Sequence, residues 1–280
     1  MKQMRLIKMS NKKVILVTGA SSGMGKLSAQ DLIKAGHIVY CVARSVDKMK
    51  DLEQIGGHVM KMDVTNEADI EEVVKQVIAE QGRIDVLWNN AGYGLYGPVE
   101  DLSMEKVQQQ FEVNVYGVAR LTKKVLPYMR EKCNGLIINT SSMGGKIYTP
   151  LGAWYHASKH AIEGFSDCLR MEVKEFGIKV VMLEPGMINT GFNAAVRDNF
   201  SFESQNSPYK RLVNGYIKAM ENNPAPGSKP EVISRTVLKI INARNPKTRY
   251  LVGRGGKLLV AIRHIFGDKA FDTMMLVTMR

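Results

Sequence analysis

A tyrosine and a lysine four residues apart, Tyr155 and Lys159, have the spacing in this sequence that points most directly to chemistry. Residues four apart share one face of a helix, so the lysine ammonium can lie beside the phenol. A neighbouring cation favours the phenolate and lowers the pKa of a tyrosine from about 10 toward neutral pH. We therefore expect Tyr155 to act as general acid or base between an alcohol and a carbonyl group.

A serine hydroxyl precedes this pair, at Ser142, just after the apolar run Leu136–Asn139. If that run is a strand, its end points into a crevice where the hydroxyl can donate to a developing oxyanion. Ser141 is an adjacent rival, and the ordinary alternative for both is a loop serine. The residues alone do not choose between them.

Two glycine-containing turns follow apolar runs and indicate a nucleotide site. Thr18–Gly25 reads TGASSGMG and opens a helix, and Asn89–Gly92 reads NNAG. Glycines let backbone approach a pyrophosphate, and a helix N-terminus offers free N–H groups to its charge. The first turn has the spacing GxxxGxG, which differs from the usual dinucleotide fingerprint GxGxxG.

Elements that could position these residues alternate along the chain. Short apolar runs, mostly continuous in Val, Ile and Leu, are typical of parallel strands covered on both faces. The runs are Val14–Val17, Ile38–Val42, His58–Met62, Ile84–Trp88, Leu136–Asn139, Lys179–Leu183 and Arg249–Val252. Helical stretches are expected at about 24–35, 66–80, 104–131, 156–176 and 230–243. This predicts an α/β fold, a doubly wound (Rossmann) parallel sheet of about seven strands with helices on both faces.

We expect one catalytic domain over residues 13–280, preceded by a basic tail at 1–12. Residues 187–229 interrupt the alternation and are polar and proline-containing, which is typical of a substrate lid after a strand. Its aromatics either bind an apolar substrate or only pack the lid onto the core, and the sequence favours neither. They are Phe192, Phe200, Phe202, Tyr209 and Tyr216.

Taken in order, these motifs resemble the short-chain dehydrogenase/reductase family in its single-domain form, nearest to 17β-hydroxysteroid and retinol dehydrogenase relatives. The resemblance covers about residues 12–190, and 190–253 in outline. It implies a catalytic set of Asn114, Ser142, Tyr155 and Lys159, with hydride exchanged between a nicotinamide and a carbonyl or alcohol carbon. It also implies cofactor contacts from Gly19, Ser21, Ser22, Gly23, Met24, Gly25, Asp63, Val64, Asn90, Ala91, Gly92, Tyr155, Lys159, Pro185, Gly186, Ile188 and Thr190.

The end of the second predicted strand favours NADP(H) over NAD(H). NAD sites place an acid there to accept from the ribose 2′-hydroxyl, but this strand reads Cys41-Val-Ala-Arg44. The Arg44 guanidinium suits a 2′-phosphate, which an acid would repel. A solvated Arg44, or one stacked on adenine, is the alternative. The basic residue that some NADP-using relatives carry before the second glycine is Ser22 here.

Charge and cysteines restrict the partners. The net charge is +12, of which residues 1–13 supply +5 and residues 253–280 supply +3, so the excess sits at the ends and nucleic acid is not expected. Cys41, Cys133 and Cys168 form no CxxC pair, so no metal is expected, and the chain reads as cytoplasmic. A small carbonyl or alcohol substrate and a homodimer or homotetramer are expected from the resemblance.

Two alternatives remain within this reading. The chain could be a 3-oxoacyl-type ketoreductase, or a catalytically silent nucleotide-binding scaffold on the same fold.

The carboxyl end, Lys257–Phe266 and Asp272–Arg280, is too short and charged to span a membrane. We expect it to pack over the substrate mouth or a neighbouring subunit, with contact to an anionic membrane surface as the other reading.

Overall fold

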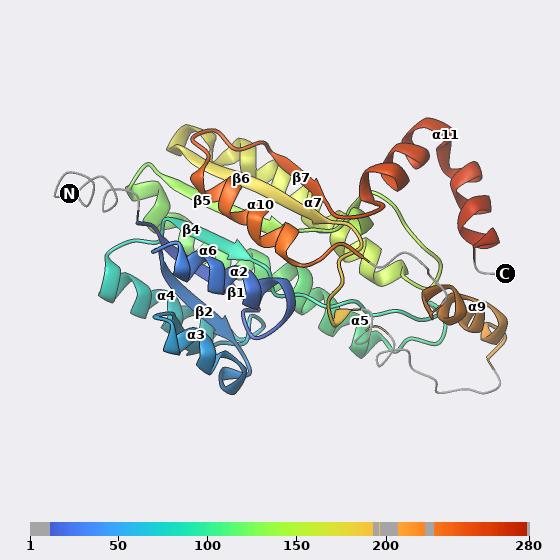
Figure 1. Cartoon of the computed structure of the whole chain (residues 1–280), viewed down its shortest axis with the longest axis horizontal. Coiled ribbons are helices and arrows are strands. Elements are labelled where there is room, and N and C mark those ends of the chain that lie inside the picture. Colours follow the sequence, from blue (N-terminus) through green and yellow to red (C-terminus); the bar gives the residue numbers. More distant parts are fainter. Residues whose placement is uncertain (1–11, 193–195, 197–206, 222–226, 279–280) are drawn as a thin grey trace.

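A single parallel sheet carries the fold, in the strand order β3-β2-β1-β4-β5-β6-β7. The computed structural model describes residues 12–192, 196, 207–221 and 227–278 (Figure 1). The strands are β1 (Val14–Thr18), β2 (Ile38–Ala43), β3 (His58–Lys61), β4 (Val86–Asn89), β5 (Gly135–Thr140), β6 (Ile178–Pro185) and β7 (Arg249–Val252). All seven predicted strands are present.

The order of the strands reverses at β1, which pairs with β2 on one side and β4 on the other. Val17 of β1, for example, lies opposite Cys41 of β2 and Trp88 of β4. In an open parallel sheet, such a reversal leaves a crevice at the carboxyl ends of the strands, where ligands bind. Both predicted glycine turns follow strands that border this crevice.

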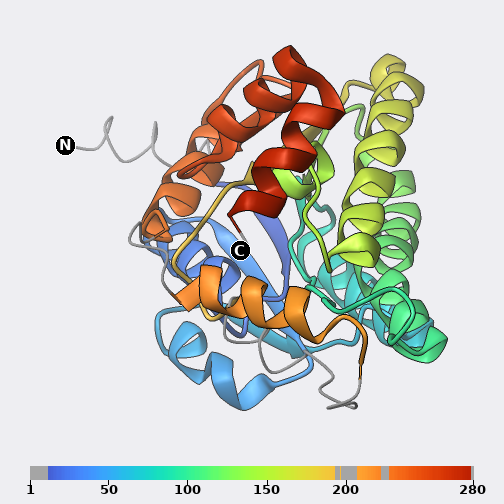
Figure 2. The same cartoon turned by 90° about the vertical axis from the view of Figure 1, so that its right-hand side faces the viewer.

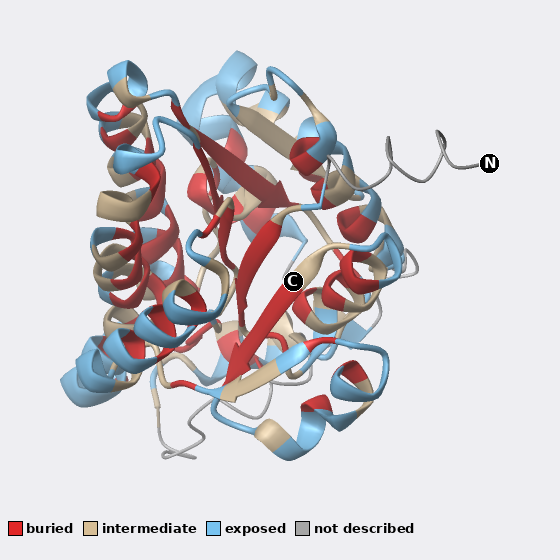
Figure 3. Cartoon of the chain, turned by 90° about the vertical axis from the view of Figure 1, so that its left-hand side faces the viewer, coloured by how far each residue is buried: buried red, intermediate tan, exposed pale blue. Residues whose placement is uncertain are grey.

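Helices cover both faces of the sheet, as predicted (Figures 1 and 2). One apolar core lies beneath α2, α3 and α10, and a second beneath α4, α6 and α7. The inner strands are buried between these layers, whereas the edge strands β3 and β7 are only partly buried and the outer helix faces are exposed (Figure 3). The helices are α2 (Gly23–Lys34), α3 (Lys50–Gln54), α4 (Glu67–Gln81), α5 (Met104–Phe111), α6 (Gly117–Glu131), α7 (Ala153–Glu172), α9 (Lys210–Glu221), α10 (Glu231–Asn242) and α11 (Gly256–Val277).

Local sequence signals explain where several helices begin. The Asn66 side chain caps α4 by accepting from the backbone N–H groups of Ala68 and Asp69, as its position predicts. The predicted helix at 104–131 is continuous, but its middle, Glu112–Tyr116, is a π-helical turn. The predicted helix at 156–176 begins earlier, at Ala153, and ends in the 3₁₀ turn Lys174–Phe176.

Some elements were not predicted from the sequence. These are α3, α9, and the 3₁₀ turns Val46–Met49 and Met143–Gly145. The carboxyl segment forms α11, which is kinked at Gly267, where φ is +74° and ψ is −179°. Within the expected lid, Phe200 and Phe202 lie outside the described residues, as do residues 1–11 of the expected tail.

Candidate active site

The two glycine turns are packed against each other at the end of β1. Thr18 holds the turn after β4, because its hydroxyl accepts from the backbone N–H groups of Asn90 and Ala91 at 2.9 Å each. The Asn90 amide in turn donates to the Thr18 carbonyl at 3.0 Å. A side-chain carbon added at Gly25 would lie 2.4 Å from that amide. Only glycine fits this contact, so the predicted turns are one structural unit.

The start of α2 offers room and hydrogen-bond donors for a phosphate group. Gly23 has φ +55°, and a side-chain carbon added there would meet nothing nearer than Thr190, at 4.0 Å. The Ser22 side chain does not cap the helix, and its first turn carries no acid. N–H groups and the positive end of the helix dipole are therefore available to an anion. The residues at Gly19–Gly25 fit a dinucleotide phosphate.

Thr190 lies near Gly23 of this turn, and Arg44 follows β2. The segment after β6 pairs with Ser228 through Ile188, and the Thr190 hydroxyl accepts from the Phe192 N–H at 3.3 Å. Arg44 is exposed at the end of β2. Burial raises the pKa of Tyr93, and the Arg44 guanidinium opposes that rise, so its charge reaches the turn after β4. A cation thus lies near the turn after β4.

Asp63 and Val64 follow β3 and lie partly buried. The Asp63 carboxylate accepts from the N–H and hydroxyl of Thr65, at 2.9 Å each, which fixes the turn. The Val64 carbonyl packs against Gly117, where a side-chain carbon would approach it to 2.9 Å. This places two of the expected cofactor contacts on a turn that is fixed by hydrogen bonds after β3.

Ser142, and not Ser141, lies beside the tyrosine. The Ser142 hydroxyl accepts from the Gly144 N–H at 3.0 Å and hydrogen-bonds the Tyr155 side chain. The Ser141 hydroxyl is buried without a hydrogen-bond partner. A side-chain carbon added at Gly145 would lie 2.6 Å from this hydroxyl. The geometry therefore places Ser142, the serine of the predicted catalytic set, nearer to Tyr155 than Ser141.

Lys159 lies one helical turn after Tyr155 on α7. Its ammonium is 5.9 Å from the centre of the Tyr155 ring and donates to the Thr140 carbonyl at 3.0 Å. Burial lowers the pKa of Lys159 to about 8, opposed by the Glu163 carboxylate. Burial also raises the pKa of Tyr155 to about 12, opposed by Ser142. The tyrosine shift is opposite to the sequence-based expectation, because enclosure of the phenol outweighs a cation that is directed at a carbonyl.

Asn114 joins this group from the π-helical turn. Its amide donates to the Tyr93 carbonyl at 2.9 Å and to the Ser158 hydroxyl at 3.1 Å. A side-chain carbon added at Gly92 would lie 3.1 Å from Asn114 Oδ1 and 3.5 Å from Lys159 Nζ. The Asn114 amide oxygen and the Lys159 ammonium thus lie close to the same face of Gly92. π-Helical turns like the one that carries Asn114 recur at functional sites.

Beneath the site, buried polar side chains that the sequence did not single out connect the strands to the helices. The Asn89 amide donates to Asn139 at 2.9 Å and to Thr122 at 3.1 Å, and the Asn139 amide donates to Ser166 at 2.9 Å. These bonds join β4, β5, α6 and α7. Because buried polar groups need their partners, the network fixes the relative positions of the strand ends.

Apolar and aromatic side chains surround Tyr155 on its open side. The Tyr96 and Phe192 rings each have their centres 5.6 Å from that of Tyr155, and the Tyr216 ring lies 5.8 Å from Tyr96. Tyr209 of the same lid donates to Glu100 at 2.8 Å. The described lid aromatics thus pack the lid onto the core, and they also make the surroundings of the tyrosine hydroxyl apolar.

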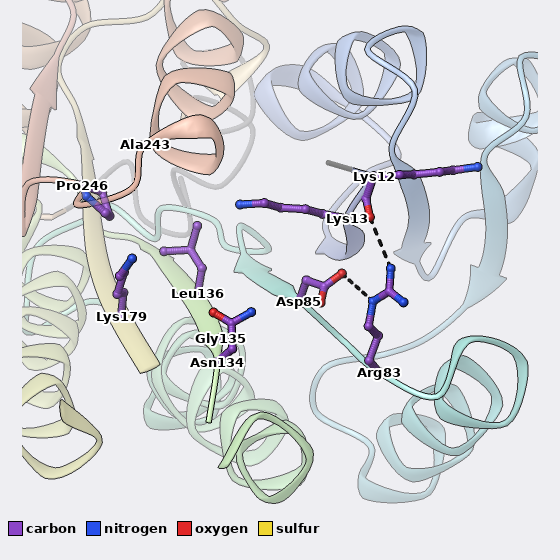
Figure 4. Close-up of a pocket in the computed structure, with 10 residues that line it drawn as sticks. All are labelled: Lys12, Lys13, Arg83, Asp85, Asn134, Gly135, Leu136, Lys179, Ala243 and Pro246. Atoms are coloured by element: carbon purple, nitrogen blue, oxygen red, sulfur yellow. Dashed lines mark hydrogen bonds and ion pairs between the residues drawn. The ribbon is translucent and has the colours of Figure 1, made fainter. Parts of the chain in front are cut away.

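A hollow lies at the opposite end of the strands from the glycine turns (Figure 4). It has a volume of about 250 Å³ and lies at the amino ends of β1, β5 and β6. Two of its three lysines are engaged with the protein, since Lys13 donates to the Ile241 carbonyl and Lys179 to that of Arg244. This end of the sheet is remote from Tyr155, and ligands of such sheets bind at the carboxyl ends of the strands.

Comparison with known proteins gives consistent results. A family model described as short chain dehydrogenase matches residues 13–200. A 3-ketodihydrosphingosine reductase of Bacteroides thetaiotaomicron is 42% identical over 242 residues, covering 86% of this chain and 88% of that protein. The uncharacterized oxidoreductase YusZ of Bacillus subtilis is 35% identical over 275 residues, covering 95% of this chain and 98% of that protein.

Solved structures agree. A short-chain dehydrogenase from Streptomyces avermitilis superposes with a TM-score of 0.81 at 32% identity, covering 94% of this chain and 95% of that one. The closed form of a serine dehydrogenase complexed with NADP⁺ has a TM-score of 0.75 at 28% identity, covering 86% and 94%.

Proposed function

The chain belongs to the short-chain dehydrogenase/reductase family and is an NAD(P)-dependent oxidoreductase, and on that premise we propose that it reduces the ketone of an apolar, long-chain substrate with NADPH. The observation that carries the proposal is the Tyr155 hydroxyl, which hydrogen-bonds Ser142 and is enclosed by aromatic side chains. An enclosed phenol that keeps its proton is suited to protonate a carbonyl oxygen.

Each residue of the group has a separate task. Tyr155 holds the proton at its hydroxyl, and Ser142 orients the carbonyl oxygen toward it. Lys159 binds the nicotinamide ribose, and Asn114 holds a proton-relay water. The glycines of the turn after β1, with Thr190 opposite, would hold the cofactor, and Arg44 would bind its 2′-phosphate. When bound, the nicotinamide supplies or accepts the hydride.

The substrate class rests on the residues around Tyr155 and on one relative. Tyr96, Phe192 and Tyr216 offer apolar area, which suits an alkyl chain better than a charged group. The relative from Bacteroides thetaiotaomicron is named a 3-ketodihydrosphingosine reductase, a name that joins a ketone to a long-chain base. We propose a substrate of that kind, and a short 3-oxoacyl compound is the alternative within the same chemistry.

We further propose that residues 13–280 work as one catalytic unit in a homodimer or homotetramer. Met104, Tyr116 and Met171, on or between α5 and α7, expose 54%, 50% and 67% of their surface. Exposed large apolar residues on neighbouring helices favour a subunit interface there. Light scattering at micromolar concentration measures the mass, and a monomer counts against this part.

NADPH oxidation tests the proposed function directly. We expect faster turnover of 3-ketodihydrosphingosine than of a short 3-oxoacyl thioester. Tyr155→Phe should lower kcat by about 10²–10⁴-fold while cofactor binding persists. No oxidation of NADPH with any ketone would favour the silent scaffold, and near-normal turnover of Tyr155→Phe would remove the tyrosine from its assigned role.

A further inference from the structure

Helix α11 is held against the protein by its inner side. Phe271, in the arm after the kink, is fully buried against Ile147 and Tyr148. In the arm before the kink, the Arg263 guanidinium lies 4.6 Å over the Tyr148 ring and donates to the Lys146 carbonyl. The helix is therefore a fixed element beside the loop that follows β5.

The other side of α11 exposes large apolar side chains. Leu258, Ile265 and Phe266 are 65%, 70% and 66% exposed, and Leu276 and Val277 are 47% and 59% exposed. Gly267 breaks the helix directly after Ile265 and Phe266. The two arms meet at an elbow that projects from the carboxyl-terminal edge of the sheet (Figure 1). Packing on the protein therefore accounts for only part of the apolar character of this helix.

Cations surround the exposed apolar residues. Lys257 and Lys269 are exposed on α11, and Lys210, Arg211 and Lys218 are exposed on α9. The acids of α11 are engaged, because Asp268 pairs with Arg263 and Asp272 accepts from the Tyr148 hydroxyl. Figure 2 looks onto the side of the molecule that carries both α11 and α9. Together α9 and α11 carry six lysine or arginine residues against three acids, Glu221, Asp268 and Asp272, so this side presents exposed apolar side chains together with a net positive charge.

We infer that this side docks on the surface of a lipid bilayer with anionic headgroups, with Ile265 and Phe266 inserted at the elbow. Apolar residues beside basic ones are what an interfacial helix needs, and basic residues near such a surface each contribute binding. In the described part of the chain no helix is long and apolar enough to cross a membrane, so the contact is peripheral. A second copy of the chain is a poorer occupant, since a two-fold contact through this side would set like charges against each other.

Helix α9 connects the docking surface to the active site. Its Val213 is buried in the same apolar cluster as Tyr155, while Lys210, Arg211 and Lys218 point to solvent. A lipid-like substrate could therefore pass from the bilayer to Tyr155 along the inner side of α9. This use of the surface rests on the proposed function, but membrane binding itself does not.

Flotation with vesicles, in the absence of substrate, tests the inference. We expect the full chain to bind vesicles of phosphatidylcholine containing about 30% phosphatidylglycerol, and to bind pure phosphatidylcholine at least tenfold more weakly. The double variant Ile265→Asp, Phe266→Asp should lose at least tenfold in partitioning. Ile55→Asp is the matched control, since Ile55 is 41% exposed at the end of α3, away from α11.

The variants also separate the possible failures. Circular dichroism and NADPH oxidation with a water-soluble ketone should be unchanged in the double variant, because these side chains touch neither cofactor nor Tyr155. Absence of binding to anionic vesicles, or equal binding by the double variant, overturns the inference. Conversion of a dimer to a monomer by the double variant, with vesicle binding intact, assigns the surface to a second copy and overturns it too.

Discussion

The ammonium group of Lys159 lies 5.9 Å from the centre of the Tyr155 ring, and its hydrogen bond goes to the Thr140 carbonyl instead of the phenol. Burial shifts the two pKa values in opposite directions, to about 8 for the lysine and about 12 for the tyrosine. Near pH 7 both groups therefore keep their protons. A neutral phenol beside a buried cation is the protonation state that carbonyl reduction requires.

An alkaline limb in the pH profile follows from these values. For reduction, kcat/KM should fall above about pH 8 as Lys159 loses its charge, while Tyr155 remains protonated. The pH dependence of kcat/KM reports groups of the free enzyme. Lys159→Arg, which keeps the cation, should move this limb beyond pH 9 even if its overall rate is lower. A limb that stays near pH 8 in Lys159→Arg would assign it to another group.

Arg44 should set the preference between the two cofactors. Arg44→Asp replaces a cation at the end of β2 by a charge that repels a 2′-phosphate, so kcat/KM for NADPH should fall by at least tenfold while that for NADH changes little. Lys75→Asp, an exposed change of the same kind on α4, is the control. Equal kcat/KM of the unmodified protein for NADPH and NADH would contradict the premise.

The fold could be predicted because its signals are local and repeated. The apolar runs that contain Val17, Trp88 and Ile138 are continuous, as burial on both faces requires, and all lie in neighbouring strands. The capping asparagine Asn66 and the position of Tyr155 on a helix were also readable, since each depends on residues within one turn.

What the sequence could not provide depends on contacts between distant segments. Which of Ser141 and Ser142 lies beside Tyr155 depends on how β5 faces α7, which no local pattern encodes. The direction of the Tyr155 pKa shift depends on enclosure by Tyr96 and Phe192, which come from other segments. The sequence shows Thr18 as the residue before Gly19, but it does not reveal that the Thr18 hydroxyl accepts a hydrogen bond from the Asn90 N–H.

His156 should make the protein less stable in acid. Its Nδ1–H donates to the Gly144 carbonyl at 2.9 Å, and its Nε2 accepts from the Thr149 N–H at 3.1 Å, so the neutral ring holds the loop after Ser142. Burial lowers the pKa of His156 to about 4, opposed by the Gly144 carbonyl. Because an unfolded histidine titrates near 6.5, this contribution is present above pH 6.5 and is lost as the pH falls toward 4.

Urea unfolding at pH 7.5 and pH 5 measures this effect. The wild-type free energy of unfolding should drop by about 2 kcal/mol more than that of His156→Gln over this interval, from the shift and 1.36 kcal/mol per pKa unit. His264→Gln, exposed on α11, is the control. An identical pH dependence in wild type and His156→Gln would show that this ring is not the titrating group.

A buried pair of carboxyl groups, Glu163 and Glu184, should act in the opposite pH direction. Both residues are at most 5% exposed, and burial, followed by the charge of Glu163, raises the pKa of Glu184, while Lys146 and Arg249 oppose the rise. Each has an Oε1 atom without a hydrogen-bond partner when both are counted as carboxylates. We therefore expect the pair to share one proton, which supplies the missing donor.

For a carboxyl whose folded pKa is raised, the stability contribution is present below the unfolded pKa, near 4.5, and is lost as the pH rises through the folded value. Glu184→Gln keeps a donor and removes the ionisation. Between pH 5 and pH 8, wild type should therefore lose on the order of 1–2 kcal/mol more unfolding free energy than Glu184→Gln. Glu175→Gln, exposed after α7, serves as the control in the same urea titrations. If wild type and Glu184→Gln showed parallel pH profiles, both carboxylates would be ionised in the folded protein, with Arg249 and Lys146 compensating their charge.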